Sequence, residues 1–350
     1  MTSPLRDSRV LAVRLSALGD IIHTLPAAAA LAAAGARLVW AVQPAARELL
    51  AGNPAVVAVV EIPRRRGWRA FFGEPRSGLL AARRALREQR CSIALDFQGL
   101  WKAALCAWAS GASRRIGFRG RFRREPLSAL LLNELRDLPV AARHVIDKNL
   151  ALLGALGLDA VGRRDFPLPP FARETAAVER ELAAMQLGRP VLLHPGGGWP
   201  SKLWPAQCYA ELAARLGRRG IPTLVTWGPG EEELADRVGA GASGGATKCF
   251  PATLLELTAL ARAARAVVAA DTGPLHLACA VGTPVVALFG PTDPERNGPW
   301  SASDRVLSRR PDCFPCHRRD CSRHAGILAA IPVEEVEQAL LARLERAARA

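Results

Sequence analysis

The sequence predicts an α/β protein built from two doubly wound domains, each with a parallel sheet covered by helices. Two stretches carry this prediction, because residues 10–42 and residues 266–289 both read as strand, helix, strand. A third observation separates them, since residues 163–173 are rich in proline and lack periodicity, as a linker does. Strands that alternate with helices in both halves are typical of parallel sheets.

The linker divides the chain into two halves of ordinary domain size. We expect a first domain over residues 1–165 and a second over residues 174–330. A final amphipathic helix over residues 333–348 is expected to pack back on the first domain.

The composition is that of a globular protein, with 50% hydrophobic and 23% charged residues in 350. The apolar run over residues 10–36 is interrupted by Arg14, Asp20, His23 and Pro26, so it fits neither a signal peptide nor a membrane anchor. Eight scattered cysteines favour a reducing compartment, and we expect a cytoplasmic protein.

The formal net charge of +15 comes almost entirely from arginine. Such a surplus suits an anionic partner, which could be nucleic acid, an acidic membrane surface or a phosphorylated substrate. Two basic runs stand out, residues 63–76 and residues 114–126, and both are expected to follow strands. The first interleaves aromatic residues with four arginines, Arg64, Arg65, Arg66 and Arg69. It fits an anionic, partly apolar surface, and a solvated loop is the alternative.

In the first half, a strand over residues 10–15 and a helix over residues 21–34 leave Ser16 and Asp20 in the intervening turn. This turn lies at the carboxyl end of the strand, where open parallel sheets bind ligands. A helix-start carboxylate without a ligand is the alternative for Asp20. A second turn, residues 96–100, opens a helix that carries Lys102.

In the second half, a strand over residues 191–194 leads into a glycine-rich loop, residues 194–205. Gly197 and Gly198 let the backbone approach a ligand, and Lys202 can meet a phosphate oxygen. The spacing is not that of a Walker A loop. Glu231 follows the strand over residues 223–226 and suits ribose hydroxyls; a helix N-terminal acid is the alternative.

The turn Asp271, Thr272 and Gly273 joins the strand over residues 266–270 to a short helix. Free amides at a helix start form a place for a phosphate, and a tight turn without a ligand is the alternative.

Near the end, a cluster of cysteine and histidine could hold a metal, although its spacing matches no strict zinc pattern. Free thiols or a labile disulfide are the alternatives. The candidate ligands are Cys313, Cys316, Cys321 and His324.

Six motifs occur together and in order, and they resemble the ADP-heptose glycosyltransferase family of lipopolysaccharide core synthesis. Segments 64–69 and 124–128 are more similar to heptosyltransferase I than to heptosyltransferase II. The motifs are SALGDIIHTLPA (16–27), DFQGLWKAA (96–104), HPGGGWPSKLWP (194–205), WGPGEEE (227–233), ADTGPLHLA (270–278) and FGPTDP (289–294).

The resemblance implies a GT-B fold of two Rossmann-like domains facing across a cleft, an inverting mechanism, and no metal or other cofactor in catalysis. The donor would be ADP-heptose and the acceptor the Kdo residue of Kdo-lipid A, at the inner face of the bacterial inner membrane. The enzyme would bind that membrane peripherally, bind no nucleic acid, and act as a monomer.

Site residues follow from the same resemblance. Asp20 matches the catalytic base, and Lys202 is expected to assist catalysis at the donor diphosphate. The other donor contacts would come from Gly197, Gly198, Glu231, Asp271, Thr272, Gly273 and His276. Acceptor contacts would come from Ser16, Arg64, Arg65, Arg66, Arg69, Gln98, Lys102 and Arg123.

Two alternatives remain open at this point. One is a sibling transferase, either heptosyltransferase II or an enzyme that uses another nucleotide sugar. The other is a non-catalytic protein that binds a nucleotide sugar or nucleic acid, which would need no base at position 20.

Overall fold

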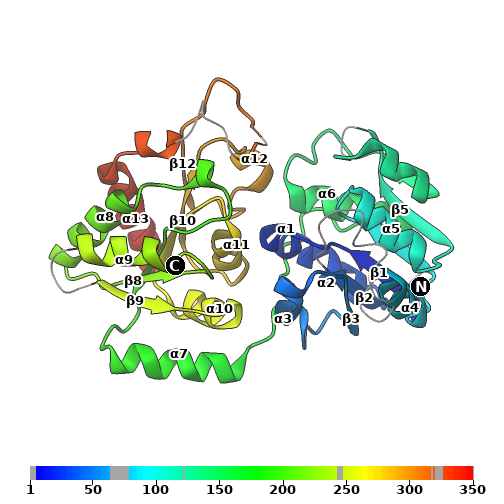
Figure 1. Ribbon diagram of the computed structural model, residues 1–350, viewed down its shortest axis with the longest axis horizontal. Coiled ribbons are helices and arrows are strands. Elements are labelled where there is room, and N and C mark those ends of the chain that lie inside the picture. Colours follow the sequence, from blue (N-terminus) through cyan, green and yellow to red (C-terminus); the bar gives the residue numbers. More distant parts are fainter. Residues whose placement is uncertain are drawn as a thin grey trace. The chain divides into compact units, whose positions relative to one another are not determined.

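A computed structural model describes residues 5–63, 79–120, 123–242, 247–316, 318–319 and 326–349. The chain forms two compact units, residues 1–169 and residues 170–350. Figure 1 shows the first in blue to green and the second in green to red. The boundary falls inside the proline-rich segment, where backbone without helix or strand separates the units.

The N-terminal unit holds a six-stranded parallel sheet in the order β3-β2-β1-β4-β5-β6. The direction in which the strands are added to the sheet reverses beside β1, which pairs with β2 on one side and with β4 on the other. Its strands are β1 (Arg9–Val13), β2 (Arg37–Val42), β3 (Ala58–Glu61), β4 (Ile93–Asp96), β5 (Arg114–Phe118) and β6 (Glu134–Arg136). Its helices are α1 (Leu18–Ile22), α2 (Leu25–Ala33), α3 (Arg47–Leu50), α4 (Leu79–Glu88), α5 (Trp101–Ala109) and α6 (Val145–Leu152), with 3₁₀ turns η1 (Pro44–Ala46), η4 (Pro126–Leu131) and η5 (Leu153–Leu156).

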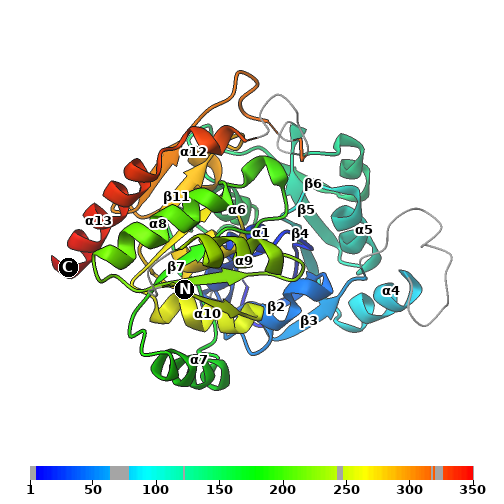
Figure 2. The same cartoon turned by 60° about the vertical axis from the view of Figure 1, so that its left-hand side comes forward.

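The C-terminal unit repeats this plan with the order β12-β11-β10-β7-β8-β9. Its strands are β7 (Val191–His194), β8 (Thr223–Trp227), β9 (Thr247–Pro251), β10 (Ala266–Ala270), β11 (Val285–Phe289) and β12 (Arg305–Ser308). Its helices are α7 (Ala172–Ala184), α8 (Ala206–Arg218), α9 (Glu232–Gly241), α10 (Leu254–Ala263), α11 (Gly273–Ala280), α12 (Pro294–Asn297) and α13 (Val333–Arg349), with 3₁₀ turns η6 (Pro200–Lys202) and η7 (Ile327–Ala330). Figure 2 shows this unit from another side.

Both faces of the second sheet are buried, which explains why its central strands are apolar throughout. Val268 and Ala270 point to the face covered by α8, α9 and α13, while Val267 and Ala269 point to the face covered by α7, α10 and α11. This alternation along β10 fixes its register, because a shift by one residue would exchange the two faces.

The C-terminal helix α13 belongs to the C-terminal unit, and its expected packing on the first domain stays a prediction. It packs on α8 and on β11 of its own unit. Val336, Leu340 and Leu344 lie in the core cluster of that sheet, and their spacing places them on one helical face. The sequence shows the amphipathic face but not its partner.

The single helix expected over residues 21–34 is two helices, α1 and α2. Pro26, the second residue of α2, has no N–H for the carbonyl of residue 22, so the helix cannot run through. Thr24 stabilises the break, because its Oγ1 donates to the Asp20 carbonyl at 2.8 Å. Asn149 of α6 donates to Thr24 Oγ1 at 3.1 Å and holds the break from outside.

Candidate active site

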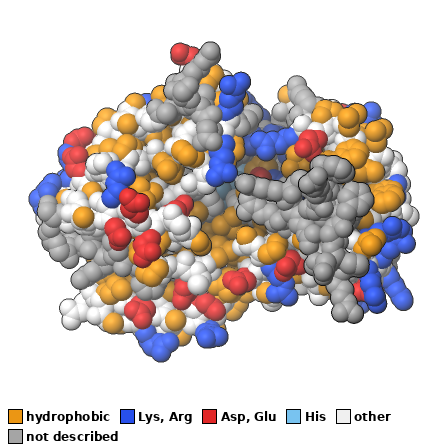
Figure 3. Space-filling view, in the orientation of Figure 1, with side chains coloured by type: hydrophobic (Ala, Val, Ile, Leu, Met, Phe, Trp, Pro, Cys, Tyr) orange, Lys and Arg blue, Asp and Glu red, His pale blue; other side chains and the backbone are white. Residues whose placement is uncertain are grey.

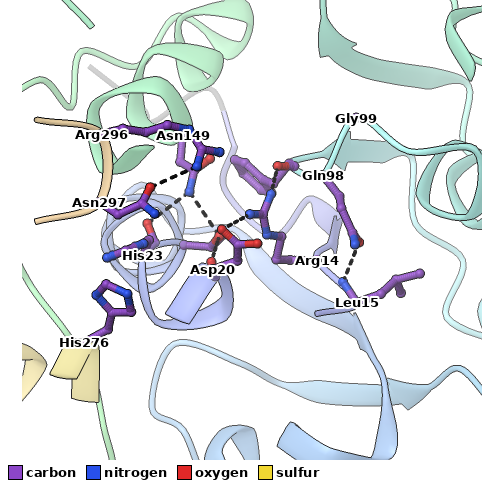
Figure 4. A network of polar contacts seen from close by, with 12 residues as sticks. Arg14, Leu15, Asp20, His23, Gln98, Gly99, Asn149, His276, Arg296 and Asn297 are labelled. Atoms are coloured by element: carbon purple, nitrogen blue, oxygen red, sulfur yellow. Dashed lines mark hydrogen bonds and ion pairs between the residues drawn. The ribbon is translucent and has the colours of Figure 1, made fainter. Parts of the chain in front are cut away.

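The N-terminal unit presents Asp20 in the first turn of α1, beyond the carboxyl end of β1 (Figure 4). Arg14, the residue after β1, pairs with it: Arg14 Nη2 lies 2.5 Å from Asp20 Oδ1. The Arg14 side chain is 6% exposed and also donates to the Phe97 carbonyl, whereas the Asp20 side chain is 35% exposed. A buried guanidinium therefore fixes the direction of a carboxylate that solvent and a substrate can reach.

The turn after β4 lies at the same edge of this sheet. Asp96 Oδ1 accepts hydrogen bonds from the amides of Gln98 at 3.0 Å and Gly99 at 2.9 Å. Gln98 Oε1 in turn accepts from the Leu15 amide at 2.9 Å. The Gln98–Leu15 hydrogen bond connects the turn after β4 to the strand end that precedes Asp20, as Figure 4 shows.

Arg123 supports this turn from inside and does not fit its expected role in acceptor binding. Its side chain is buried, and its Nη2 lies 3.1 Å from Asp96 Oδ2. Arg123 Nε also donates to Ser128 Oγ at 3.1 Å. A guanidinium with these partners is almost completely buried and offers little surface to a substrate.

The second basic run does not follow a strand, contrary to the expectation from the sequence, because it begins with β5. Arg114 pairs with Glu134 at 2.9 Å, and Arg115 donates to the carbonyls of Leu131 and Ala112. Ser16 and Gln98 are half-buried at the strand ends, and Lys102 is exposed. Arg64, Arg65, Arg66 and Arg69 lie outside the described residues.

The centre of the C-terminal site is Asp271, which follows β10 and is almost completely buried. Lys202 Nζ lies 2.6 Å from its Oδ2, and Thr292 Oγ1 donates to the same oxygen at 2.6 Å. His276 Nε2 lies 3.1 Å from Oδ1. Burial opposes ionisation, but the His276 hydrogen bond and the Lys202 charge outweigh it and hold the pKa of Asp271 well below its usual range.

Lys202 and the start of α11 therefore lie together, as the sequence predicted for a phosphate site. Thr272 occupies the N-cap position of α11 but makes no side-chain cap; its Oγ1 donates to the Ala270 carbonyl at 3.2 Å. The first amides of α11 are thus not used by Thr272, and they carry the positive end of the helix dipole.

Glu231 joins the glycine-rich loop to the turn after β8. Its Oε1 accepts from the Gly197 amide at 2.8 Å and its Oε2 from the Gly228 amide at 2.9 Å. A Cβ at Gly196 would lie 1.9 Å from Glu231 Oε2, so any other residue there would displace the Glu231 carboxylate. At Gly198 a Cβ would meet nothing within 4 Å, so only the first part of the loop needs its glycines.

His194, the last residue of β7, lies beneath this carboxylate with its Nε2 3.9 Å from Glu231 Oε2. Its Nδ1 lies 3.0 Å from Thr226 Oγ1. Burial lowers the pKa of His194 to about 4 against the opposing charge of Glu231, so the ring is neutral at pH 7.

Three residues of these clusters were missed by sequence reasoning. Arg14 had a usable signal, because an arginine directly after a buried apolar strand needs a partner. Thr292 lies in the FGPTDP motif, which was noted but given no role. His194 ends a buried strand, and its partners on β8 and in the turn after β8 gave no sequence signal.

The cysteine cluster receives no test from the structure. Cys321 and His324 lie outside the described residues, as do the four residues around them. Within the described part of the chain, no three cysteine, histidine or carboxylate side chains are grouped to hold a metal.

Two doubly wound parallel sheets, each with polar residues at the carboxyl ends of its strands, fit the GT-B fold of glycosyltransferases. Glycosyltransferase family 9 (heptosyltransferase) matches residues 79–325. The chain belongs to this family.

Relatives support the same assignment along nearly the whole length. The chain is 34% identical over 322 residues to lipopolysaccharide heptosyltransferase 1 of Pseudomonas aeruginosa, covering 90% of this chain and 87% of that protein. It is 30% identical over 307 residues to the Escherichia coli K12 enzyme of the same name, with 85% and 92% covered.

Solved structures share the fold. The Escherichia coli heptosyltransferase WaaC with ADP aligns at a TM-score of 0.75 and 26% identity, covering 96% of this chain and 99% of that one. A family 9 glycosyltransferase from Veillonella parvula aligns at a TM-score of 0.80 over 98% and 99% of the two chains, with 20% identity. The fold is therefore GT-B, and the chain is a glycosyltransferase rather than a non-catalytic binding protein.

Proposed function

We propose that this glycosyltransferase transfers L-glycero-D-manno-heptose from ADP-heptose to the Kdo residue of Kdo-lipid A. The observation that carries the proposal is the Lys202–Asp271 pair at the start of α11, which suits a diphosphate leaving group. The first acceptor in the inner core is favoured over the second because, within Escherichia coli K12, the chain is 30% identical over 307 residues to heptosyltransferase 1 and 28% identical over 280 residues to heptosyltransferase 2.

The reaction needs a base, and Asp20 is the proposed one. An acceptor hydroxyl attacks the anomeric carbon of the heptose while its proton passes to the Asp20 carboxylate. The bond from that carbon to the diphosphate oxygen breaks, and its electron pair leaves with ADP. Attack from the face opposite the leaving group inverts the configuration. Arg14 would act by orienting the carboxylate, because it contacts Asp20 and is itself buried.

The departing ADP gains negative charge, and Lys202 would stabilise it. A lysine ammonium has three N–H donors. Two of them point to Asp271, to Oδ2 at 2.6 Å and to the carbonyl at 3.2 Å, which leaves one for a phosphate oxygen. Asp271 thus aims Lys202, and the amides at the start of α11 add fixed donors that need no reorganisation during the reaction.

Glu231 would hold the ribose of the donor. A carboxylate offers about four acceptor positions, and the Gly197 and Gly228 amides use two of them. The remaining positions can accept the ribose hydroxyls, and the side chain is 24% exposed. Because these amides fix the carboxylate before the ligand arrives, binding loses little side-chain entropy.

The acceptor is a lipid, so the enzyme would bind the cytoplasmic face of the inner membrane peripherally, as a monomer. The excess of basic residues supports the membrane binding, because anionic lipids attract basic side chains. Among the described residues, no helix is long and apolar enough to cross a membrane.

The test is direct. The protein is incubated with ADP-heptose and lipopolysaccharide that lacks all heptose, and the product is weighed by mass spectrometry. The proposal predicts the addition of one heptose to this acceptor and none to an acceptor that already carries the first heptose. Transfer only to the second acceptor would instead indicate a heptosyltransferase 2 activity.

A further inference from the structure

Helix α5 of the N-terminal unit carries its tryptophans on the solvent-facing side, whereas a core helix buries its large apolar residues. Its buried residues are small, as at Ala103, Ala104 and Ala107, whereas Trp101 and Trp108 are 42% and 46% exposed. The two tryptophans are seven residues apart, which places them on nearly the same side of the helix. Helix α5 therefore presents an aromatic stripe to the outside.

The adjacent turn η4 extends this stripe. Leu127 and Leu130 are 72% and 78% exposed, and residues three apart in a 3₁₀ helix project from the same side. Helix α5 packs against η4, and the Trp101 amide donates to the carboxylate of Glu125, next to the start of η4. We call these four residues, Trp101, Trp108, Leu127 and Leu130, the apolar patch.

Cations outnumber carboxylates around the apolar patch, where Glu88 and Glu125 are exposed. The Arg83 guanidinium of α4 lies 5.7 Å from the centre of the Trp108 ring. Lys102, Arg87 and Arg124 are exposed on α5, on α4 and just before η4. Figure 3 shows apolar and basic side chains intermixed on the N-terminal unit. Single exposed apolar residues need no explanation, but four on two adjoining elements with a basic border indicate an interaction site.

We propose that the apolar patch docks the N-terminal unit onto an anionic phospholipid surface. Tryptophan rings favour the boundary between lipid headgroups and acyl chains, and arginine and lysine meet the phosphates around them. Charge complementarity favours a bilayer over a second copy of this chain, because two basic borders would repel one another. The inference rests on the proposed function, since a lipid-linked acceptor requires the enzyme to reach the membrane.

Binding to vesicles tests the apolar patch. Purified protein is sedimented with vesicles of phosphatidylethanolamine and phosphatidylglycerol, and with phosphatidylcholine vesicles for comparison. The wild type is expected to bind the anionic vesicles, and less as salt rises. The double variants W101S/W108S and L127Q/L130Q should each lower the partition coefficient by more than about tenfold.

A matched control removes exposed apolar residues elsewhere. Val57 and Val161 are 53% and 73% exposed and lie outside α4, α5 and η4, so V57S/V161S should bind vesicles as the wild type does. Heptose transfer to a deacylated, water-soluble acceptor should be unchanged in both patch variants. The transfer assay distinguishes the role of the apolar patch from the proposed function. A wild type that transfers no heptose to the soluble acceptor would count against the proposed function and not against the apolar patch.

Three results would overturn the inference. Patch variants that bind anionic vesicles like the wild type would assign membrane binding to another segment. A wild type that binds no vesicles would remove the docking role altogether. A wild type that is dimeric by light scattering, with monomeric W101S/W108S and no vesicle binding, would identify the patch as a contact between two copies.

Discussion

Replacing Lys202 with methionine removes the cation beside a buried carboxylate. Asp271 and Lys202 are 2% and 15% exposed, so solvent screens their interaction only weakly. Loss of one partner from a buried ion pair costs about 3–5 kcal/mol. Asp271 keeps two partners, Thr292 and His276, so we expect about 3 kcal/mol less stability of the C-terminal unit at pH 7.

The pH dependence of this stability loss follows from the direction in which the pKa of Asp271 is shifted. The pKa of Asp271 is lower in the folded than in the unfolded chain, so its contribution is complete above about pH 4 and is lost as the pH falls further. The cost of K202M should therefore be full above about pH 5 and should shrink towards pH 3. Protonated Asp271 no longer needs the cation.

Hydrogen exchange of the β7 and β10 amides measures the unfolding free energy of the C-terminal unit, because these amides report on that unit alone. K202R, which keeps the charge, is the control and should lose less stability than K202M. Adding D271N to K202M should restore part of the loss, since the unpaired charge is then gone. A cost below about 1 kcal/mol at pH 7, or no recovery in the double variant, would mean that Lys202 does not stabilise the buried Asp271 charge.

Three further predictions concern residues around the two clusters. Gly196→Ala should displace the Glu231 carboxylate and raise the ADP dissociation constant about five- to a hundredfold, whereas Gly198→Ala should leave it unchanged; calorimetry that finds the two alike would contradict this. Arg14→Met should lower kcat about a hundredfold with unchanged ADP affinity, and R14K should recover part; equal rates in steady-state kinetics would remove the orienting role. The wild type should lose at most about 3 kcal/mol of unfolding free energy as the pH falls from about 6.5 to 4, because the folded state resists protonation of the His194 ring. His194→Asn should remove this loss in urea titrations; an unchanged dependence of stability on pH would exclude His194 as the cause.

Buried strands were predicted well because their apolar runs are bounded by glycine, proline or aspartate. The bounds of β7, β10 and β11 coincide with those expected from the sequence. The edge strands β6, β9 and β12 received no prediction. β6 and β12 are short and carry charged residues at solvent-facing edges, so their sequences lack that pattern.

The candidate site was predictable only where a residue lies in the turn or loop that follows a strand. Asp271 and Glu231 occupy such positions, and the structure gives both of them backbone or side-chain partners at those strand ends. Arg123 shows the limit of that reasoning. It belongs to the second basic run and was expected to contact the acceptor, yet it is buried against Asp96, 27 residues earlier in the chain. Only the fold brings these two residues together.

The most direct test of the central claim is the rate of heptose transfer by Asp20→Asn, measured beside its affinity for ADP. If Asp20 is the base, transfer should fall by about 10²–10⁴-fold while the ADP dissociation constant stays within about twofold. Asparagine keeps the shape of the side chain but cannot accept the proton. Transfer at close to the wild-type rate would contradict the account, because the acceptor would then be activated by another group.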